Sequence, residues 1–372
     1  MKIKVNRNDL LDELSHITPI VEKSTKMPIL SHILLDAKGD DQQLVLAGSD
    51  LDVSVKSSCP AQIDEQGAIA LPAKDFTDMV RFLPDNAEIE IRTEGSERVH
   101  ISSGKAKFRM VCLPDETFPI IPALEGKEIT LPGDILRRMI QMTIFSVTQE
   151  QSRFTLNGIL LIINRNFLKM VSTDGHRMAY VETTKAFEDL ETEIKILIPK
   201  KTVTELSKML QGQSDLFVQF ANDENHLYFK IGNRLLVSRL LAGQFPNYEL
   251  VIPRNLIHQV VCDTNGLKLS INRVNVLADE VSKRVLFLLR DGRMVLRTEN
   301  VKKGEAEEEV EVDYNGDPVE LGFNSQYLIE FLSVVDTPEV VFEFSDNDSP
   351  GLLRPHDEVD YVYKYVVMPM SV

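Results

Sequence analysis

This sequence lacks the features that would place a protein in a membrane or outside the cell. No apolar run approaches the roughly 20 residues that cross a bilayer, and the opening residues, MKIKVNRNDLL, have no apolar signal-peptide core. The three cysteines, Cys59, Cys112 and Cys262, are far apart and form no CxxC pair, so neither a disulfide framework nor a zinc site is expected. We therefore expect a cytoplasmic protein with no membrane partner, whose cysteines are buried in a reducing compartment.

The familiar motifs of nucleotide, metal and serine-nucleophile sites are also missing from the sequence. It contains no GxxxxGK[ST], GxGxxG, HExxH or GxSxG and no EF-hand loop, and its seven histidines are scattered. Neither a cofactor nor a metal ion is therefore expected.

Basic residues are fewer than acidic residues in this sequence. Lysine and arginine number 41 against 57 acidic residues, a formal net charge of −16, which argues against a protein that coats nucleic acid through a basic surface. Any contact with DNA or RNA has to be local. Six segments with apolar residues at helical spacing are together close to neutral, and so are basic relative to the rest of the chain; they lie at residues 8–16, 74–81, 134–142, 200–208, 268–276 and 324–332.

A pattern that occurs three times organises the chain. An apolar strand followed by a Ser/Thr-acid step recurs, and its acidic residues, Asp50, Asp174 and Glu299, lie 124 and 125 residues apart in a chain of 372. Because this spacing is one third of the length, we predict three similar units. The copies read LVLAGSDL at 44–51, LKMVSTDG at 168–175 and RMVLRTEN at 293–300.

A second repeated stretch defines the fold class. In each third a short β-rich run, a break and a helical segment are followed by an alternating strand: AEIEIRT, LFVQFAN or VVFEFSD. Each unit should contain two helices and about seven short strands, an α+β organisation with antiparallel sheets. In the third unit, VVCDTNGLKLSI can be interpreted as strand or as the start of a helix. The acidic run EAEEEVEV at 305–312 is expected to be a solvated edge strand. We place the domains at 1–127, 128–253 and 254–372.

The stretch STDGHRMAY at 172–180 resembles both a turn and an active site. Asp-Gly between two apolar runs is a strong hairpin signal, because both residues tolerate positive φ. A catalytic role for Asp174, His176 and Arg177 would need a nucleophile and an orienting group nearby. The hairpin is the favoured interpretation.

Taken together, the threefold repeat, STDGHRMAY, FPNY at 245–248 and the terminal YVVMPM resemble the bacterial sliding clamps, the β subunits of the DNA polymerase III holoenzyme. The resemblance also covers MPILSHILL, LPAKDF and RFTLNGILL, in the same order. It implies three similarly folded domains per protomer and a head-to-tail homodimer, a six-domain ring whose helices line a hole for double-stranded DNA. It further implies a non-enzymatic processivity factor, bound without sequence preference and placed on DNA by an ATP-driven clamp loader.

The same resemblance implies a peptide-binding pocket at the TDGH turn. Short linear peptides bearing glutamine and Leu or Phe would dock there, from the replicative polymerase α subunit, the clamp loader, and repair and translesion polymerases. The matching positions are Leu156, Thr173, Gly175, His176, Arg177, Met178, Pro246, Val251, Val366, Val367, Met368, Pro369 and Met370. Leu250 stands where some relatives have a basic residue, and the chain ends in MSV rather than an Arg-containing tail.

Two further sets of residues are assigned by resemblance. The DNA-facing set is Lys23, Lys26, Arg137, Arg138, Arg153, Phe154, Lys200, Lys201 and Lys208, although Ser24 and Thr155 replace an arginine and an aromatic residue of some relatives. At the protomer interface, Phe108 and Met110 would meet Val276 and Leu277. Two alternatives stay open: a hydrolase or nucleic-acid-processing enzyme that uses Asp174 and His176, and a scaffold with no DNA in its hole.

Overall fold

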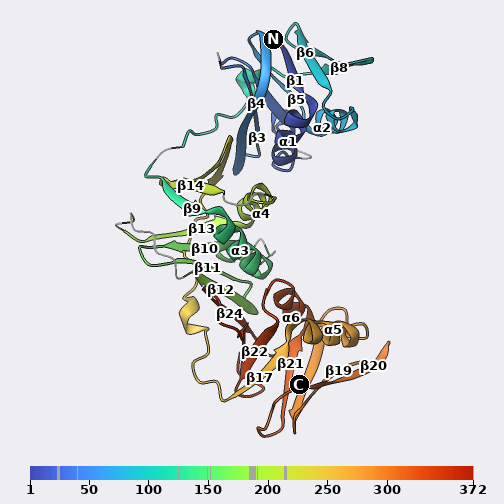
Figure 1. Cartoon of the computed structure of the whole chain (residues 1–372), viewed down its shortest axis with the longest axis vertical. Helices are drawn as coiled ribbons and strands as arrows, with labels where there is room; N and C mark the ends of the chain where they lie inside the picture. The colour runs from blue at the N-terminus through green and yellow to red at the C-terminus, as the bar shows by residue number, and fades with distance from the viewer. Residues whose placement is uncertain are drawn as a thin grey trace. The chain divides into compact units, whose positions relative to one another are not determined.

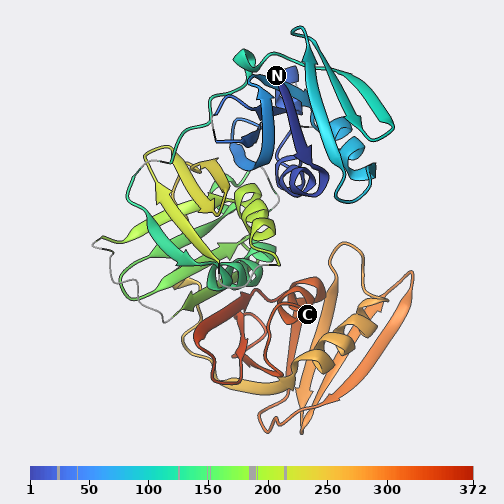
Figure 2. The same ribbon diagram turned by 45° about the horizontal axis from the view of Figure 1, so that its top comes forward.

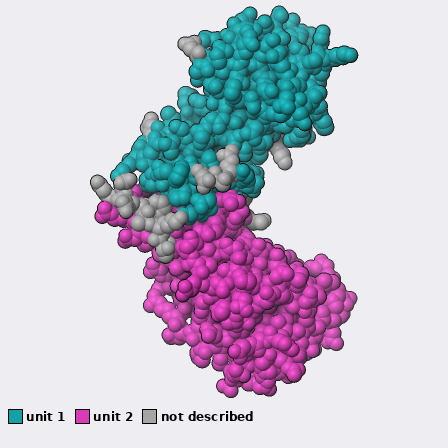
Figure 3. Space-filling view, in the orientation of Figure 1, with its two compact units in different colours: residues 1–136, 201–240 teal, residues 137–200, 241–372 magenta. Residues whose placement is uncertain are grey.

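The computed structural model describes residues 1–22, 26–39, 41–124, 126–148, 150, 152–183, 190, 192–212 and 216–371. It divides into two compact units, one of residues 1–136 with 201–240 and the other of residues 137–200 with 241–372 (Figure 3). The middle third of the chain contributes to both. Each unit is described by itself.

The first third of the chain forms an antiparallel sheet with two helices packed on it (Figure 1). Helix α1 buries Leu10, Leu14 and Ile17, which recur every three or four residues along one face, and the Asn6 side chain caps its first turn by accepting from the Asn8 N–H at 2.8 Å. The elements are β1 Lys2–Asn6, α1 Arg7–Ile17, β2 His32–Asp36, β3 Gln43–Ser49, β4 Val53–Glu65, β5 Ala68–Pro72, α2 Ala73–Phe82, β6 Glu88–Glu94, β7 Arg98–Ser103 and β8 Ala106–Val111.

The middle third repeats this order of elements. They are β9 Ile129–Pro132, α3 Gly133–Thr143, β10 Gly158–Ile163, β11 Leu168–Thr173, β12 Arg177–Thr183, β13 Ile194–Pro199, α4 Lys200–Met209, β14 Phe217–Asn222, β15 His226–Ile231 and β16 Arg234–Arg239. Strand β10 is buried along its whole length, which explains its continuous apolar sequence GILLII.

The last third repeats the order once more, with α5 lying across β18, β19 and β20 (Figure 2). Its elements are β17 His258–Asp263, α5 Thr264–Asn275, β18 Arg284–Arg290, β19 Arg293–Asn300, β20 Gly304–Glu311, β21 Val319–Asn324, α6 Ser325–Leu332, β22 Glu339–Phe344, β23 Gly351–Pro355 and β24 Tyr361–Val367. Helix α5 begins at Thr264 because Asp263 caps it through the Gly266 N–H, so the ambiguous stretch is strand up to Asp263 and helix beyond it.

The prediction of three similar α+β units is confirmed. Within the described residues each third has two α-helices and eight strands, one more strand than predicted, in the identical order β-α-β-β-β-β-α-β-β-β. The third copy of the strand-acid pattern differs from the other two, because Glu299 lies inside β19 and not in a turn. Among the described strands, the acidic strand β20 pairs only with β19 and is an edge strand, as expected. The predicted domain boundaries at 127/128 and 253/254 lie between elements and stay predictions.

Strand pairing joins consecutive thirds of the chain. Within the first unit β4 pairs with β16 (Val55 opposite Leu236), and within the second unit β12 pairs with β24 (Met178 opposite Val366). We call these two strand pairings seams. In both seams the fourth strand of one third pairs with the last strand of the next third. The sheets that result have twelve, eight and four strands among the described residues.

Candidate functional site

The hairpin between β11 and β12 presents the TDGH turn. Asp174 Oδ1 accepts hydrogen bonds from the N–H groups of His176 at 3.0 Å and Arg177 at 3.1 Å, while the Thr173 hydroxyl donates to the Arg177 carbonyl at 2.6 Å. Gly175 has a φ of +90°, and a Cβ there would come within 2.7 Å of Arg153 Nη1. The turn therefore requires glycine, and it leaves the His176 side chain exposed.

The Arg177 side chain points inward from this turn and is fully engaged. Only 8% exposed, it donates from Nε to Asp174 Oδ2 at 3.0 Å, from Nη2 to the Phe145 carbonyl at 2.6 Å and from Nη1 to Glu330. Its guanidinium also stacks on Tyr327, 4.3 Å from the ring centroid. Burial would lower the pKa of Arg177, but Tyr365 and Glu330 outweigh it and raise that pKa above its usual value. Arg177 is thus a permanently charged brace that holds the hairpin against α6.

The end of the chain forms a tail, residues 368–371, beside the hairpin. The Met368 N–H donates to the His176 carbonyl at 2.9 Å, and the Met370 N–H donates to the Gly322 carbonyl at 2.8 Å. The Met368 side chain is exposed, whereas Pro369 and Met370 are half-buried. The tail therefore links the eight-stranded sheet, through the hairpin, to strand β21 of the four-stranded sheet.

A buried apolar cluster supports the hairpin and the loop that follows β16. Met178 and Val366, both 1% exposed, pack with Tyr248 and Leu352, and Phe245 packs against them. In the loop that contains Tyr248, Pro246, Leu250 and Val251 are exposed. Among the residues assigned to the peptide pocket, Met178, Val366 and Val367 are buried beneath the surface, while His176, Pro246, Val251 and Met368 are exposed on it. The remaining members, Leu156, Thr173, Gly175, Arg177, Pro369 and Met370, lie in the same compact unit.

The hairpin geometry does not support the enzyme alternative. Both carboxylate oxygens of Asp174 are committed to the turn and to Arg177, so the carboxylate does not orient His176 as a base. In the described part of the chain no group of three or more His, Cys, Asp or Glu side chains could hold a metal ion. No described helix is long and apolar enough to cross a membrane.

The basic residues assigned to DNA are mostly held by neighbours within the chain. Arg153 donates to the Asp174 carbonyl at 2.9 Å and Lys208 pairs with Glu205 at 2.8 Å, while Lys201 pairs with Asp50. Burial, and secondarily the charge of Arg177, lower the pKa of Lys200, whose ammonium donates to the Val147 carbonyl at 3.2 Å. The remaining members of this set are placed as follows: Arg138 pairs with Asp360, Arg137 is half-buried, Lys26 and Phe154 are exposed, and Lys23 lies outside the described residues, as does Ser24.

The residues assigned to the protomer interface lie at a sheet edge and at the end of a helix. Phe108 and Met110 are on β8, which terminates the path of the twelve-stranded sheet. Val276, directly after α5, is 71% exposed, and Leu277 is half-buried. The exposure of Phe108 and Val276 is greater than that of ordinary core residues.

Sequence reasoning missed the residues of α6 that hold the hairpin. Glu330 and Tyr327 contact Arg177 from 153 and 150 positions away in the chain, and no local motif marks them. A single acidic residue inside the apolar stretch QYLIEFL is the only available signal, and it is equally typical of a solvated helix face.

Comparison with known proteins places the whole chain in one family of sequences. Three family models match: the N-terminal domain of the DNA polymerase III beta subunit over residues 1–122, its central domain over 130–247 and its C-terminal domain over 249–371. The chain is 34% identical to the beta sliding clamp of Caulobacter vibrioides over 379 residues and 34% identical to that of Pseudomonas putida over 375, covering 100% of both proteins in each case.

Solved structures agree with the sequence comparison. The DnaN sliding clamp of Pseudomonas aeruginosa bound to griselimycin superposes with a TM-score of 0.93 at 33% identity, and that of Bartonella birtlesii bound to griselimycin with 0.93 at 31% identity. Both alignments cover 100% of each chain.

Proposed function

This chain belongs to the DNA polymerase III beta subunit family, the bacterial sliding clamps, and is thus a DNA sliding clamp, a non-catalytic processivity factor. On that premise we propose that it closes into a head-to-tail homodimeric ring around duplex DNA. We further propose that it docks partner peptides at the TDGH hairpin. Tethering raises the effective concentration of a bound polymerase at its template, so the gain is in processivity and not in chemistry. The site of action is the cytoplasm, where bacterial DNA is replicated.

The pattern of strand pairing in the two seams is the observation that supports the ring. Strand β4 pairs with β16 and β12 pairs with β24, always the fourth strand of one repeat with the last strand of the next. Continuing the series, β20 should pair with the last strand of a following repeat, and the equivalent strand still free is β8 of a second copy. Both β20 and β8 are edge strands in the described sheets. The same interaction, made twice, closes a dimer.

Charge and apolar surface at the two edges are complementary. Strand β8 and the turn before it contribute Lys105, Lys107 and Arg109, whereas β20 has glutamates at 305, 307, 309 and 311. Phe108 and Met110 on one edge, with Val276 and Leu277 beside the other, supply the apolar contact. This arrangement supports the head-to-tail orientation, since like edges would repel.

The electrostatics support weak contact with DNA and therefore sliding. Lys201, Lys208 and Arg138 are already paired with carboxylates, so these three side chains are less available to release counterions from phosphate. A topological link does not need tight binding. Lys26, Arg137, Arg153, Phe154 and Lys200, together with Lys23, complete the proposed DNA-facing set.

The hairpin, the loop after β16 and the tail support the proposed peptide-binding pocket. His176, Pro246, Val251 and Met368 are exposed on the hairpin, the loop and the tail, and Met178 and Val366 belong to the buried apolar cluster; methionine repacks around different ligands. The partners we propose are the replicative polymerase α subunit, the clamp loader, and repair and translesion polymerases, each through a short linear peptide. Two related clamps were solved with griselimycin bound, which supports a ligand-accepting surface in this family.

Retention on circular DNA tests the proposal. The protein is incubated with its loader, ATP and a nicked circle, and the circle is then cut once. Protein that stays on the circle and leaves on linearisation is topologically linked. Equal binding before and after the cut would mean direct affinity for DNA, and no retention with an active loader would support the scaffold alternative.

A further inference from the structure

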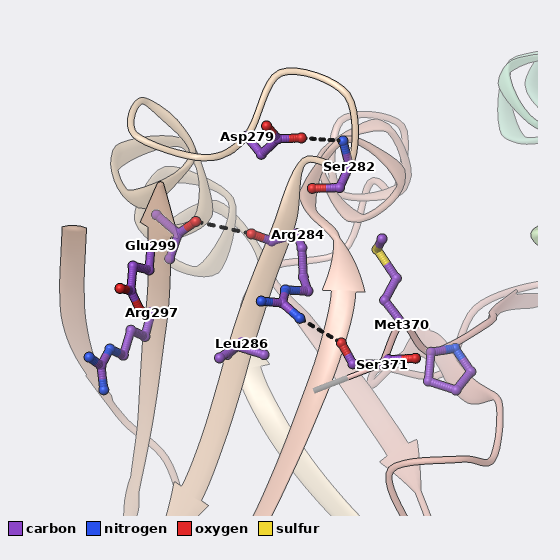
Figure 4. Close-up of a pocket in the computed structure, with 10 residues that line it drawn as sticks. Asp279, Ser282, Arg284, Leu286, Arg297, Glu299, Met370 and Ser371 are labelled. Carbon is purple, nitrogen blue, oxygen red and sulfur yellow. Dashed lines mark hydrogen bonds between the residues drawn. The ribbon is translucent and has the colours of Figure 1, made fainter. Parts of the chain in front are cut away.

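A pocket lined partly by the tail lies in the second unit (Figure 4). We call it the tail pocket. It has a volume of about 680 Å³ and is lined by strands β18 and β19, the loop after α5 and the tail. The lining residues are Asp279, Ser282, Arg284, Leu286, Arg297, Thr298, Glu299, Pro369, Met370 and Ser371. None of them belongs to the turn that supports the proposed peptide pocket.

Arg284 is the cation of the tail pocket. The residue is half-buried, and its Nη1 donates to the Ser371 carbonyl at 2.7 Å (Figure 4). Within the described part of the chain it makes no ion pair, whereas Arg297 already approaches Glu305 at 3.6 Å. A guanidinium with one fixed bond to a carbonyl and further N–H donors is a ready partner for a carboxylate.

The nearby carboxylate of Asp279 is committed to its own loop. It accepts hydrogen bonds from the N–H groups of Ser282 at 2.9 Å and Val281 at 3.1 Å, and these bonds lower the pKa of Asp279. In Figure 4 this loop is at the opposite end of the pocket from Leu286, with Arg284 between them. Asp279 therefore lies at the loop end of the pocket, whereas Arg284 lies beside an apolar wall; Glu299 lines the pocket from β19.

That apolar wall consists of Leu286, Pro369 and Met370. A ligand group that fits the cation and the wall together carries a carboxylate on a short aliphatic stem. The glutamate side chain has this form: its methylenes pack on the wall while its carboxylate reaches the guanidinium.

Two residues connect the tail pocket to the proposed peptide pocket. Pro369 and Met370 line the tail pocket and also belong to the set assigned to peptide binding. We propose that the tail pocket is an accessory site that accepts a glutamate side chain flanking the peptide segment held at the hairpin. The inference rests on the proposed function, and it adds a specificity element that neither the hairpin nor the apolar cluster provides.

Paired peptides test this site in the intact protein. Each fluorescent peptide has a core of glutamine, leucine and phenylalanine and an amidated C-terminus, and carries either Glu or Gln at one to four positions from either end of the core. Fluorescence anisotropy measures the dissociation constants. At the best position the Glu peptide should bind about five-fold tighter than its Gln counterpart, the scale of a charged hydrogen bond at a half-exposed site. Equal affinities at every position would overturn the inference.

Two variants show which residue is responsible. Arg284→Met keeps the volume of the side chain and should abolish the preference for Glu, whereas Arg290→Met, at the exposed end of the same strand, should preserve it. Because Arg284→Met also removes a contact to the tail, the ratio between the two peptides is compared and not the absolute affinity. A preference that survives Arg284→Met would overturn the assignment, and the wild-type comparison holds even if this variant misfolds.

The remaining outcomes separate the pocket from the function on which it rests. If a Gln peptide with a free C-terminal carboxylate binds as tightly as the Glu peptide, the pocket accepts the carboxylate of a chain end. That result would overturn the glutamate side chain as the proposed occupant. Measurable but equal binding of Glu and Gln peptides overturns the tail pocket alone. No binding of any peptide overturns peptide docking and the tail pocket together.

Discussion

The Met368 N–H donates to the His176 carbonyl oxygen at 2.9 Å, so the tail extends the pairing of β12 with β24 as far as the TDGH turn. Two residues later, the Met370 N–H bonds to Gly322 on β21. Main-chain bonds therefore hold the tail on both sides, and the side chains of Met368 and Met370 remain available for ligands. The position of the tail should control peptide affinity.

Gly322→Ala should displace the tail. A Cβ at this position would lie 2.7 Å from the Met370 carbonyl oxygen, a clash between backbone groups that no side-chain rotation relieves. We expect peptide affinity measured by anisotropy to fall about tenfold, or about 1.4 kcal/mol, while the dimer dissociation constant stays unchanged. Unaltered peptide binding would mean that the tail does not form part of the pocket.

Arg177→Met should destabilise the second unit by about 3 kcal/mol, because it leaves the partly buried carboxylates of Asp174 and Glu330 without their shared cation. The measurement is urea unfolding followed by circular dichroism. Arg290→Met is the matched control and should change stability by less than about 0.5 kcal/mol. Similar losses in both variants would refute the bracing role of Arg177.

Charge reversal at the sheet edges tests the dimer. Lys107→Glu should raise the dimer dissociation constant about tenfold in sedimentation experiments at low salt, since it places a like charge opposite the glutamates of β20. The reverse change Glu307→Lys should do the same, and the double variant should recover most of the loss. Lys230→Glu, on β15 in the interior of its sheet, is the control for net charge. A double variant weaker than either single variant would contradict the pairing.

Mild acid should destabilise the first unit through His16. Burial, and secondarily the charge of Arg234, lower the pKa of His16, while Asp12, Glu13 and Glu205 partly offset this. The unfolded chain therefore takes up the proton first, and the stability present above about pH 6.5 is lost as the pH falls through the unfolded and then the folded pKa. His16→Asn should lose less unfolding free energy than wild type between about pH 7.5 and 5.5. An equal loss of unfolding free energy in both proteins would mean that His16 does not cause this pH dependence.

Periodicity was sufficient to predict the repeat, because each copy preserves its apolar spacing and its turn residues. The six helices and the edge strand β20 follow from local signals of this kind. Local signals carry no information about partners far apart in the chain, and so the β4–β16 and β12–β24 seams were not predicted.

The candidate site likewise has one part that local signals predict and another part that they do not. The Asp-Gly turn was predicted from its own residues, since only its local backbone conformation was needed. The brace of Arg177 by Glu330 and the tail pocket around Arg284 depend on contacts between elements distant in sequence, and their residue types are as common on solvated surfaces as in sites. Resemblance, and not pattern, supplied the residues of the proposed peptide pocket, which stay a prediction.

The seams between repeats have a consequence for how this protein can evolve. A joint made of ladder hydrogen bonds uses the peptide groups that every residue except proline supplies. Substitutions along β4, β12, β16 and β24 can therefore accumulate while the joints persist, provided that the inward-facing positions stay apolar. Architecture and surface are thereby uncoupled, and binding surfaces such as the tail pocket are free to diverge between lineages on an unchanged frame.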